Sequence, residues 1–136
     1  MSREVPEGRR QQIAADPFCS LLGIELVDLA PGSATMTLTL TEDLVNFHGI
    51  PHGGAVHGLA DAAFAAASNA AGQQAIALET NISYLDAVDV GTRLTAIAEE
   101  RHASRRTGAF SVEVTDQDAD PVALFRGRAY TPEQDV

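Results

Sequence analysis

Apolar and polar residues alternate along several stretches of the chain. The most regular is Ser33–Thr41, where threonines fill most positions between the apolar side chains. Its apolar residues are Ala34, Met36, Leu38 and Leu40. A period of two is typical of a strand with one buried face. The preceding stretch, Gly23–Leu29, alternates less regularly and is joined to it by the turn signal Ala30–Gly32, so the two stretches predict a hairpin.

A loop over Leu44–Gly54 leads into a segment rich in alanine, the residue with the highest helix propensity. This segment predicts a helix from about Gly54 to Ala71, with Gly72 as its C-terminal stop. One face of the helix is apolar and holds Val56, Leu59, Ala63, Ala66 and Ala70. The opposite face is small and mildly polar and holds Gly54, His57, Gly58, Asp61, Ala65 and Ser68.

Strand patterns return after the helix. Four strands are predicted, over Ala75–Leu85, Thr92–Glu100, Thr107–Thr115 and Val122–Tyr130. Near the N-terminus, Pro6–Phe18 predicts a short helix that leads to Cys19. Two strands, one long helix and four strands predict an α+β architecture, in which an antiparallel sheet wraps around a single central helix.

Length and composition narrow the class of protein. The 136 residues fit one domain, residues 1–136, with residues 1–18 as an N-terminal extension or helix. Hydrophobic residues make up 45%, enough for a packed core. No stretch predicts a membrane span, and the polar segment Met1–Gln12 lacks the apolar run of a secretory signal. The single cysteine, Cys19, excludes an internal disulfide and is expected to be a packing residue, so a cytoplasmic setting is expected.

Charge is distributed unevenly. The net charge of −10 argues against non-specific binding of nucleic acid, which needs a basic face. Asp61 is the only Asp, Glu, Lys or Arg between Asp43 and Glu79, so the predicted helix lacks the charged face of a surface helix. A six-stranded sheet can cover one side of this helix. A second subunit is then the natural cover for the other side, and at least a dimer is expected.

The start of the helix carries the most informative chemistry. In His52-Gly53-Gly54, glycines leave backbone N–H groups accessible at a helix N-terminus, which suits a developing oxyanion. Asp61 follows two turns later on the face of Gly54, roughly 10 Å away within one helix. That distance is too large for both to touch one carbonyl carbon. A two-fold dimer could bring the glycines of one chain to Asp61 of the other.

The pattern N-x-H-G-x-x-H-G-G at Asn46–Gly54, followed by L-A-D-x-A-F-A at Leu59–Ala65, resembles the PaaI-type (phenylacetyl-CoA) thioesterases of the hot-dog superfamily. Asn81–Leu85 and Ser104–Thr107 are similar to that family as well, and the resemblance runs from about Leu22 to Tyr130. It implies a hot-dog fold whose dimer has one continuous sheet, with a dimer or a dimer of dimers (a homotetramer) as the assembly. It also implies hydrolysis of an acyl-CoA to a free acid and CoA without a cofactor, as in phenylacetic acid degradation.

The resemblance assigns roles to several residues. Gly53 would donate its N–H to the thioester oxygen, and Asp61 of the facing subunit would attack the carbonyl carbon or activate water. Asn46 would place water or substrate, although it could be only a loop cap, and His52 would brace the loop rather than act as a base. Some relatives carry a serine on the strand after the helix. The corresponding position here is Ala77, with Thr80 as a possible substitute.

Other residues are candidates for substrate contacts. Gly54 shares the helix start with Gly53, and Phe64 flanks Asp61, where it could line an acyl pocket or belong to the core. Arg105 and Arg106 form a basic group with nearby Arg101 and His102, so they could contact CoA phosphates or be solvated turn residues. Arg126 and Arg128 alternate along the last strand and are expected on its outer face.

Three alternatives assign the same residues to other uses. His48, His52, His57 and Asp61 could suggest a metal site, but most of these histidines lie in a Gly/Pro loop without a cysteine, so no metal is expected. A hydratase or dehydratase for enoyl or hydroxyacyl thioesters shares the expected fold, and a non-catalytic acyl-CoA-binding protein is a third class. The glycines at the helix start favour the thioesterase. The acyl preference and the direction of any pKa shift of Asp61 stay open.

Overall fold

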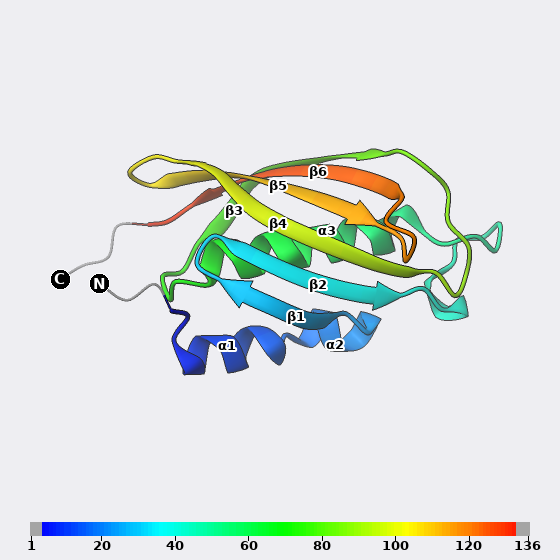
Figure 1. Ribbon diagram of the computed structural model, residues 1–136, viewed down its shortest axis with the longest axis horizontal. Helices are drawn as coiled ribbons and strands as arrows, with labels where there is room; N and C mark the ends of the chain where they lie inside the picture. The colour runs from blue at the N-terminus through cyan, green and yellow to red at the C-terminus, as the bar shows by residue number, and fades with distance from the viewer. Residues whose placement is uncertain (1–3, 133–136) are drawn as a thin grey trace.

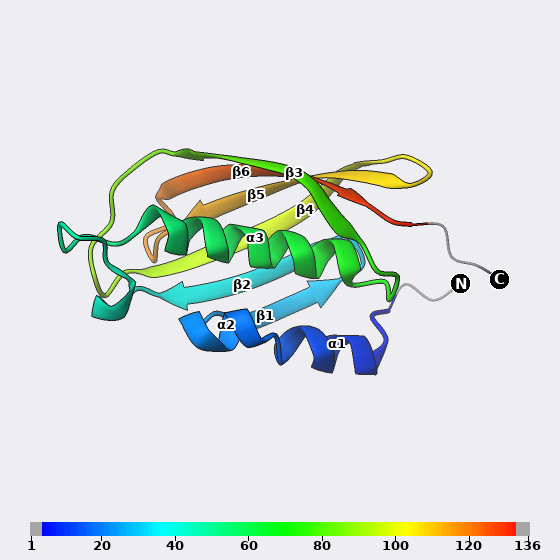
Figure 2. The same cartoon turned by 180° about the vertical axis from the view of Figure 1, so that it is seen from behind.

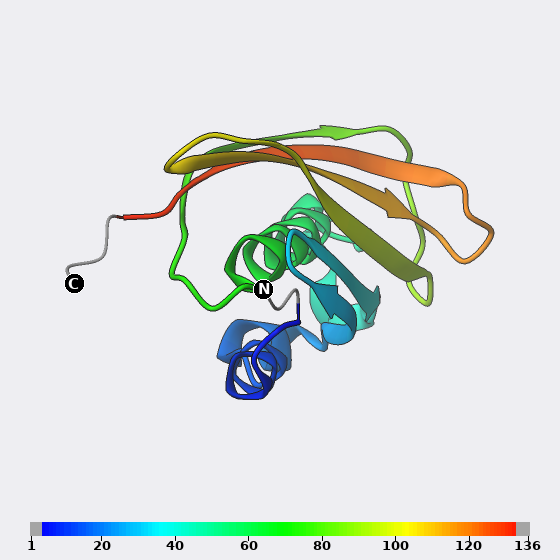
Figure 3. The same cartoon turned by 60° about the vertical axis from the view of Figure 1, so that its left-hand side comes forward.

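The computed structural model describes residues 4–132. An antiparallel sheet curves around one long helix, α3 (Gly53–Asn69), which lies along its concave face (Figure 1, Figure 3). The strands are β1 (Glu25–Ala30), β2 (Ser33–Thr39), β3 (Ile76–Tyr84), β4 (Arg93–Ala103), β5 (Thr107–Thr115) and β6 (Pro121–Tyr130). They are ordered β1-β2-β4-β5-β6-β3. The predicted α+β arrangement of two strands, a helix and four strands is therefore confirmed.

The core lies between α3 and the inner face of the sheet. The residues predicted for the apolar face of the helix are all buried, namely Val56, Leu59, Ala63, Ala66 and Ala70. The alternating residues Ala34, Met36, Leu38 and Leu40 of the β2 region are buried opposite them. Burying apolar surface stabilises the fold by roughly 25 cal/mol per Å². The apolar faces that the alternation in β2 and the helical period in α3 create therefore hold the sheet and the helix together.

The N-terminal segment differs from the prediction. A single helix over Pro6–Phe18 is wrong, because the chain forms two short helices, α1 (Glu7–Ala14) and α2 (Pro17–Leu22). The break falls at Asp16, whose extended ψ of 123° is the conformation favoured before a proline. Asp16 then caps α2 by accepting the Cys19 N–H at 3.0 Å. The two helices pack beside α3 and β1 (Figure 2).

Element boundaries differ from the predicted ones by a few residues. Helix α3 begins at Gly53, one residue early, and a short 3-10 helix, η1 (Glu42–Leu44), precedes the loop before it. Strand β4 continues to Ala103, past the predicted end at Glu100. Among residues 4–132, no helix is both long enough and apolar enough to cross a membrane.

Strand β3 forms one edge of the sheet, beside β6. Apart from Thr80 and Ile82, which are half-buried, its residues are exposed. Among the exposed ones are the large apolar side chains Ile76, Leu78 and Tyr84. A long exposed edge strand with apolar side chains is a surface on which another strand can pair.

Candidate active site

The N-terminus of α3 is capped by His52. Its Nδ1 accepts the Gly54 N–H at 2.8 Å, and its carbonyl oxygen accepts the Ala55 N–H at 3.0 Å. Within the described chain, the Gly53 N–H donates no hydrogen bond. Of the two glycines, Gly53 therefore offers the free donor at the positive end of the helix dipole, whereas the Gly54 N–H is already used.

Asn46 organises the loop that leads to this helix. Its Oδ1 accepts the backbone N–H groups of His48 at 2.9 Å and Ile50 at 3.3 Å. Gly49 closes the turn with a φ of +82°, a conformation that favours glycine. The loop holds Phe47 outward with 93% of its side chain exposed. Asn46 is thus a loop cap through its oxygen, while its amide NH₂ donates to no other residue in the described range.

Asp61 lies on the mildly polar stripe of α3 and is half-buried. Its carboxylate has no hydrogen-bond donor among residues 4–132. Burial raises the pKa of Asp61 above its usual value, and the charge of nearby His57 opposes that rise. The direction of the shift, which the sequence leaves open, follows from burial without compensating N–H donors.

Thr80 reaches the same stripe from strand β3. Its Oγ1 lies 3.4 Å from His57 Nε2, one helical turn before Asp61. Ala77, the other position considered for the missing serine, is exposed on β3. Of these two positions it is therefore Thr80 that brings a hydroxyl group to the helix. The sequence placed His57 on the same helix face as Asp61, four residues earlier. Nothing in the sequence indicated that His57 would contact Thr80.

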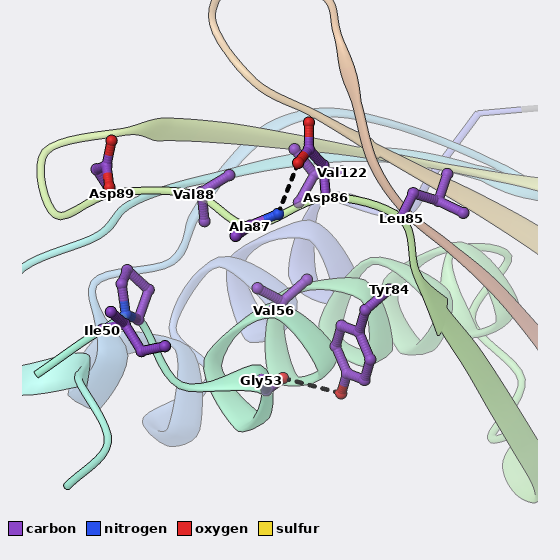
Figure 4. A pocket seen from close by; sticks show the side chains of 11 residues that line it. Ile50, Gly53, Val56, Tyr84, Leu85, Asp86, Ala87, Val88, Asp89 and Val122 are labelled. Atoms are coloured by element: carbon purple, nitrogen blue, oxygen red, sulfur yellow. Dashed lines mark hydrogen bonds between the residues drawn. The ribbon is translucent and has the colours of Figure 1, made fainter. Parts of the chain in front are cut away.

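An open pocket of about 510 Å³ adjoins Gly53 (Figure 4). The Tyr84 hydroxyl donates to the Gly53 carbonyl at 3.1 Å, which ties the end of β3 to the first turn of α3. Tyr84 was not among the predicted site residues. The other lining residues are largely apolar and include Ile50, Pro51, Val56, Leu85, Val88 and Val122. Asp61 is not among the residues that line this pocket.

Phe64 belongs to the core. Its side chain is 2% exposed, and its ring lies 5.5 Å from that of Phe110 and 5.7 Å from that of Phe125, measured between centroids. Gly127 on β6 gives this ring room, because a Cβ there would lie 2.8 Å from Phe64 Cζ. A role for Phe64 in lining an acyl pocket is therefore corrected to a packing role in this chain.

The arginines lie away from Gly53. Arg105 and Arg106 are in the turn of the β4–β5 hairpin, which extends past the C-terminal end of α3 (Figure 2). Arg126 and Arg128 are exposed on β6, and Arg128 Nη1 lies 3.4 Å from Glu79 Oε1. One chain alone therefore does not bring the predicted CoA-phosphate contacts to the free glycine N–H.

The histidines do not gather around a common point. His52 caps α3, and His57 faces Thr80. Among the described residues, one group could offer three metal-ligating atoms, Asp116, Asp118 and Asp120 in the β5–β6 turn. There, Asp116 Oδ1 accepts the backbone N–H groups of the other two, as expected for a capped turn.

Gly53 and Asp61, the two groups predicted to act on a carbonyl, are separated on one rigid helix. Eight residues of helix place them about 12 Å apart at 1.5 Å per residue. Helix α3 thus carries an N–H without a hydrogen bond at its start and, two turns later, a half-buried carboxylate of raised pKa that does not line the pocket beside Gly53.

Comparisons with known proteins agree on one family. Residues 48–123 match the thioesterase superfamily. The chain is 35% identical to the acyl-coenzyme A thioesterase PaaI of Escherichia coli K12 over 130 residues, covering 96% of this chain and 93% of that protein. The structure of E. coli PaaI from the phenylacetic acid degradation operon matches with a TM-score of 0.85, covering 93% and 95% of the two chains.

Two further solved structures are similar. The TT0310 protein of Thermus thermophilus is 41% identical, with a TM-score of 0.82, and the match covers 86% of this chain and 98% of that one. The smu.793 protein of Streptococcus mutans UA159, bound to acetyl CoA, is 25% identical, with a TM-score of 0.76, and the match covers 83% and 91%. The chain belongs to the thioesterase superfamily as a PaaI-type member with the hot-dog fold, and it is a thioester hydrolase.

Proposed function

We propose that this protein hydrolyses acyl-CoA thioesters at a site shared between two subunits. The observation that carries the proposal concerns two groups on helix α3, in which Asp61 is the only Asp, Glu, Lys or Arg. Among residues 4–132, the Gly53 N–H beside the open pocket and the half-buried Asp61 carboxylate both lack a hydrogen-bond partner. The name of the E. coli relative, an acyl-coenzyme A thioesterase, and the acetyl CoA bound to the S. mutans protein support CoA as the carrier.

In the proposed reaction, the thioester carbonyl oxygen accepts a hydrogen bond from the Gly53 N–H. Negative charge that develops on this oxygen is stabilised by that donor and by the helix dipole. Asp61 of the facing subunit accepts a proton from water as the water oxygen attacks the carbonyl carbon. The C–S bond then breaks, and the CoA thiolate leaves with the returned proton, so that a free acid and CoA result.

The raised pKa of Asp61 suits this role. A carboxylate made more basic by burial takes a proton from water more readily, provided that the pH stays above its pKa. Direct attack by Asp61 would give a mixed anhydride that water then hydrolyses. Hydrolysis in ¹⁸O-labelled water under single-turnover conditions distinguishes the two, because only the anhydride route can place an unlabelled Asp61 oxygen in the first product acid.

A two-fold dimer is the proposed assembly. The exposed edge of β3 offers backbone groups for pairing with a second β3, which would continue the sheet across both chains. The half-exposed stripe of α3 around Asp61 would then face its counterpart. Such an arrangement overcomes the separation of about 12 Å within one helix, since the helix start of one chain can approach the middle of the other helix.

The remaining candidates fill supporting roles in this proposal. Asn46 directs its amide NH₂ toward water or substrate, and His52 holds the helix start in place. The pocket beside Gly53 accommodates an apolar acyl group. Arg105 and Arg106 would reach the CoA phosphates from another subunit, because they lie at the far end of their own sheet.

The test follows free thiol release from phenylacetyl-CoA and several straight-chain acyl-CoAs. Asp61→Asn should remove most turnover and leave the oligomer intact. Gly53→Pro should also remove most turnover, because proline lacks the N–H but is favoured at the first helical position. Gly53→Ala is the matched control, since it adds a Cβ 3.3 Å from the Tyr84 ring but keeps the donor.

Two results would overturn the proposal. One is the absence of thiol release from every acyl-CoA, particularly if an enoyl-CoA is hydrated instead, which would favour the hydratase alternative. The other is equal activity of the Gly53→Pro and Gly53→Ala variants, which would remove the Gly53 N–H from the mechanism.

A further inference from the structure

His57 lies between Gly53 and Asp61 on helix α3 but has no part in the steps above. It is half-buried on the same stripe as Asp61, one turn earlier in α3. Strand β3 approaches it through Thr80, and strand β6 through Phe125. A polar ring in this position either only fills space in the packing or orients a neighbouring group through a hydrogen bond.

The ring of His57 is held in a defined orientation. Its centroid lies 5.5 Å from that of the buried Phe125, with an interplanar angle of 64°, an edge-to-face contact. Its Nε2 lies 3.4 Å from the Thr80 hydroxyl oxygen, the long end of the hydrogen-bond range. The contact therefore joins the helix that carries Asp61 to the edge strand.

We propose that His57 is a positioning residue that orients the Thr80 hydroxyl toward the attacking water of the thioesterase reaction. This inference rests on the proposed function. In the neutral imidazole with its proton on Nδ1, Nε2 accepts the Thr80 O–H. The lone pairs of Thr80 Oγ1 are then left to accept a hydrogen bond from water, whose other hydrogen faces Asp61.

Few other charges act on His57 within the described residues. On its own helix the nearby charged group is Asp61. The charged residues of β3 and β6 alternate to the outer face of the sheet and are Glu79, Arg126 and Arg128. From α2, the apolar Phe18 covers neighbouring Gly58, while Asp16 at the start of α2 caps the Cys19 N–H. Tyr84 is engaged with the Gly53 carbonyl.

A double-mutant cycle tests the coupling. His57→Phe keeps an aromatic ring against Phe125 but loses Nε2, and Thr80→Val keeps the shape but loses the hydroxyl. Each single variant should lower kcat for acyl-CoA hydrolysis by about fivefold to tenfold, the size of one neutral hydrogen bond. The double variant should be no slower than Thr80→Val alone, because both changes remove the same interaction.

Two further variants keep the test decisive if His57→Phe does not fold. His57→Gln retains an acceptor near the Nε2 position without titrating, and Thr80→Ser retains the hydroxyl, so both should recover most of kcat. A structural role alone predicts no such recovery, because Gln fills the space of the imidazole ring less well than Phe does.

The inference is overturned if the losses from His57→Phe and Thr80→Val multiply in the double variant, or if His57→Gln is as slow as His57→Phe. These outcomes differ from failure of the proposed function, in which the wild-type protein itself releases no thiol from acyl-CoA.

Discussion

Gly127 sets how closely helix α3 can approach the sheet, and Gly127→Ala tests that packing. A Cβ at this position would lie 2.8–2.9 Å from three atoms of the Phe64 ring, where ordinary contact begins at 3.4 Å. The ring cannot easily retreat, because Phe110 and Phe125 pack against it and all three are buried. Overpacking of this kind costs about 1–3 kcal/mol.

The expected thermal shift follows from the chain length. Unfolding entropy near 60 °C is about 2.1 cal/mol/K per residue, or roughly 290 cal/mol/K for this chain, so the cost corresponds to a fall in Tm of about 3–10 °C. Thermal unfolding followed by circular dichroism gives the Tm. The protein concentration must be fixed, because an oligomer's Tm depends on it.

Two controls isolate the cause. Gly8→Ala places its Cβ in open space on the exposed helix α1, and its Tm should be equal to or slightly above that of the wild type. Phe64→Leu in the Gly127→Ala background should recover part of the loss, since a smaller side chain relieves the contact. If Gly127→Ala leaves the Tm unchanged, or if the losses from both changes simply add, Phe64 does not pack against β6 as described.

Three other predictions concern single residues. Asp61→Asn should raise the Tm at pH 7 even as turnover is lost, because burial raises the pKa of Asp61 and the folded state bears the cost of its charge. This cost appears as the pH rises through 3.8, so the Tm gap should close below that pH, and a gap that widens in acid would contradict the sign. His52→Ala should destabilise α3 by about 0.5–2 kcal/mol through loss of the N-cap, while His52→Asn should not; calorimetry that finds the two equal would refute the capping role. Burial raises the pKa of Cys19 to about 11, so Ellman's reagent should label it at pH 8 only after unfolding in urea, and rapid labelling of the native protein would contradict its burial.

The regular elements were predictable from the sequence because their periods are strong. The alternation in β2 and the alanine-rich helical pattern of α3 each lead directly to a buried face. The N-terminal helix was not predicted correctly, because its pattern passes through Pro17 and the conformational limit on the preceding Asp16 decides where it breaks. In this segment, the restriction that proline places on the preceding residue ended the helix, although the sequence pattern predicted that it would continue.

The candidate site was predictable only in part. The sequence pointed to Gly53 and Asp61, because helix starts and lone charges have local signatures, and to His52 as a brace of the loop, whereas the structure shows His52 as the N-cap of α3. It did not predict the contact between His57 and Thr80, which depends on the register that sets Thr80 opposite Gly127 and Ile82 opposite Phe125 on β6. A shift of one residue reverses which side chains face the helix, so this contact required the three-dimensional register.

The position of Arg105 and Arg106 relative to Gly53 also required the three-dimensional structure. Their spacing in the sequence suggests a phosphate contact, but the β4–β5 hairpin carries them past the end of α3. Whether they act on the substrate depends on the assembly rather than on the chain. The same is true of Gly53 and Asp61, which one helix keeps apart.

The central claim is that Gly53 of one chain and Asp61 of another form each active site. Two differently tagged variants, Asp61→Asn and Gly53→Pro, are unfolded, mixed in equal amounts, refolded together and assayed for thiol release from a substrate of the wild-type enzyme. Random pairing makes half of the dimers mixed, and each mixed dimer contains one intact site of two, so activity should return to about one quarter of the wild-type value. Activity no greater than that of the two parent variants refolded separately would contradict the shared site.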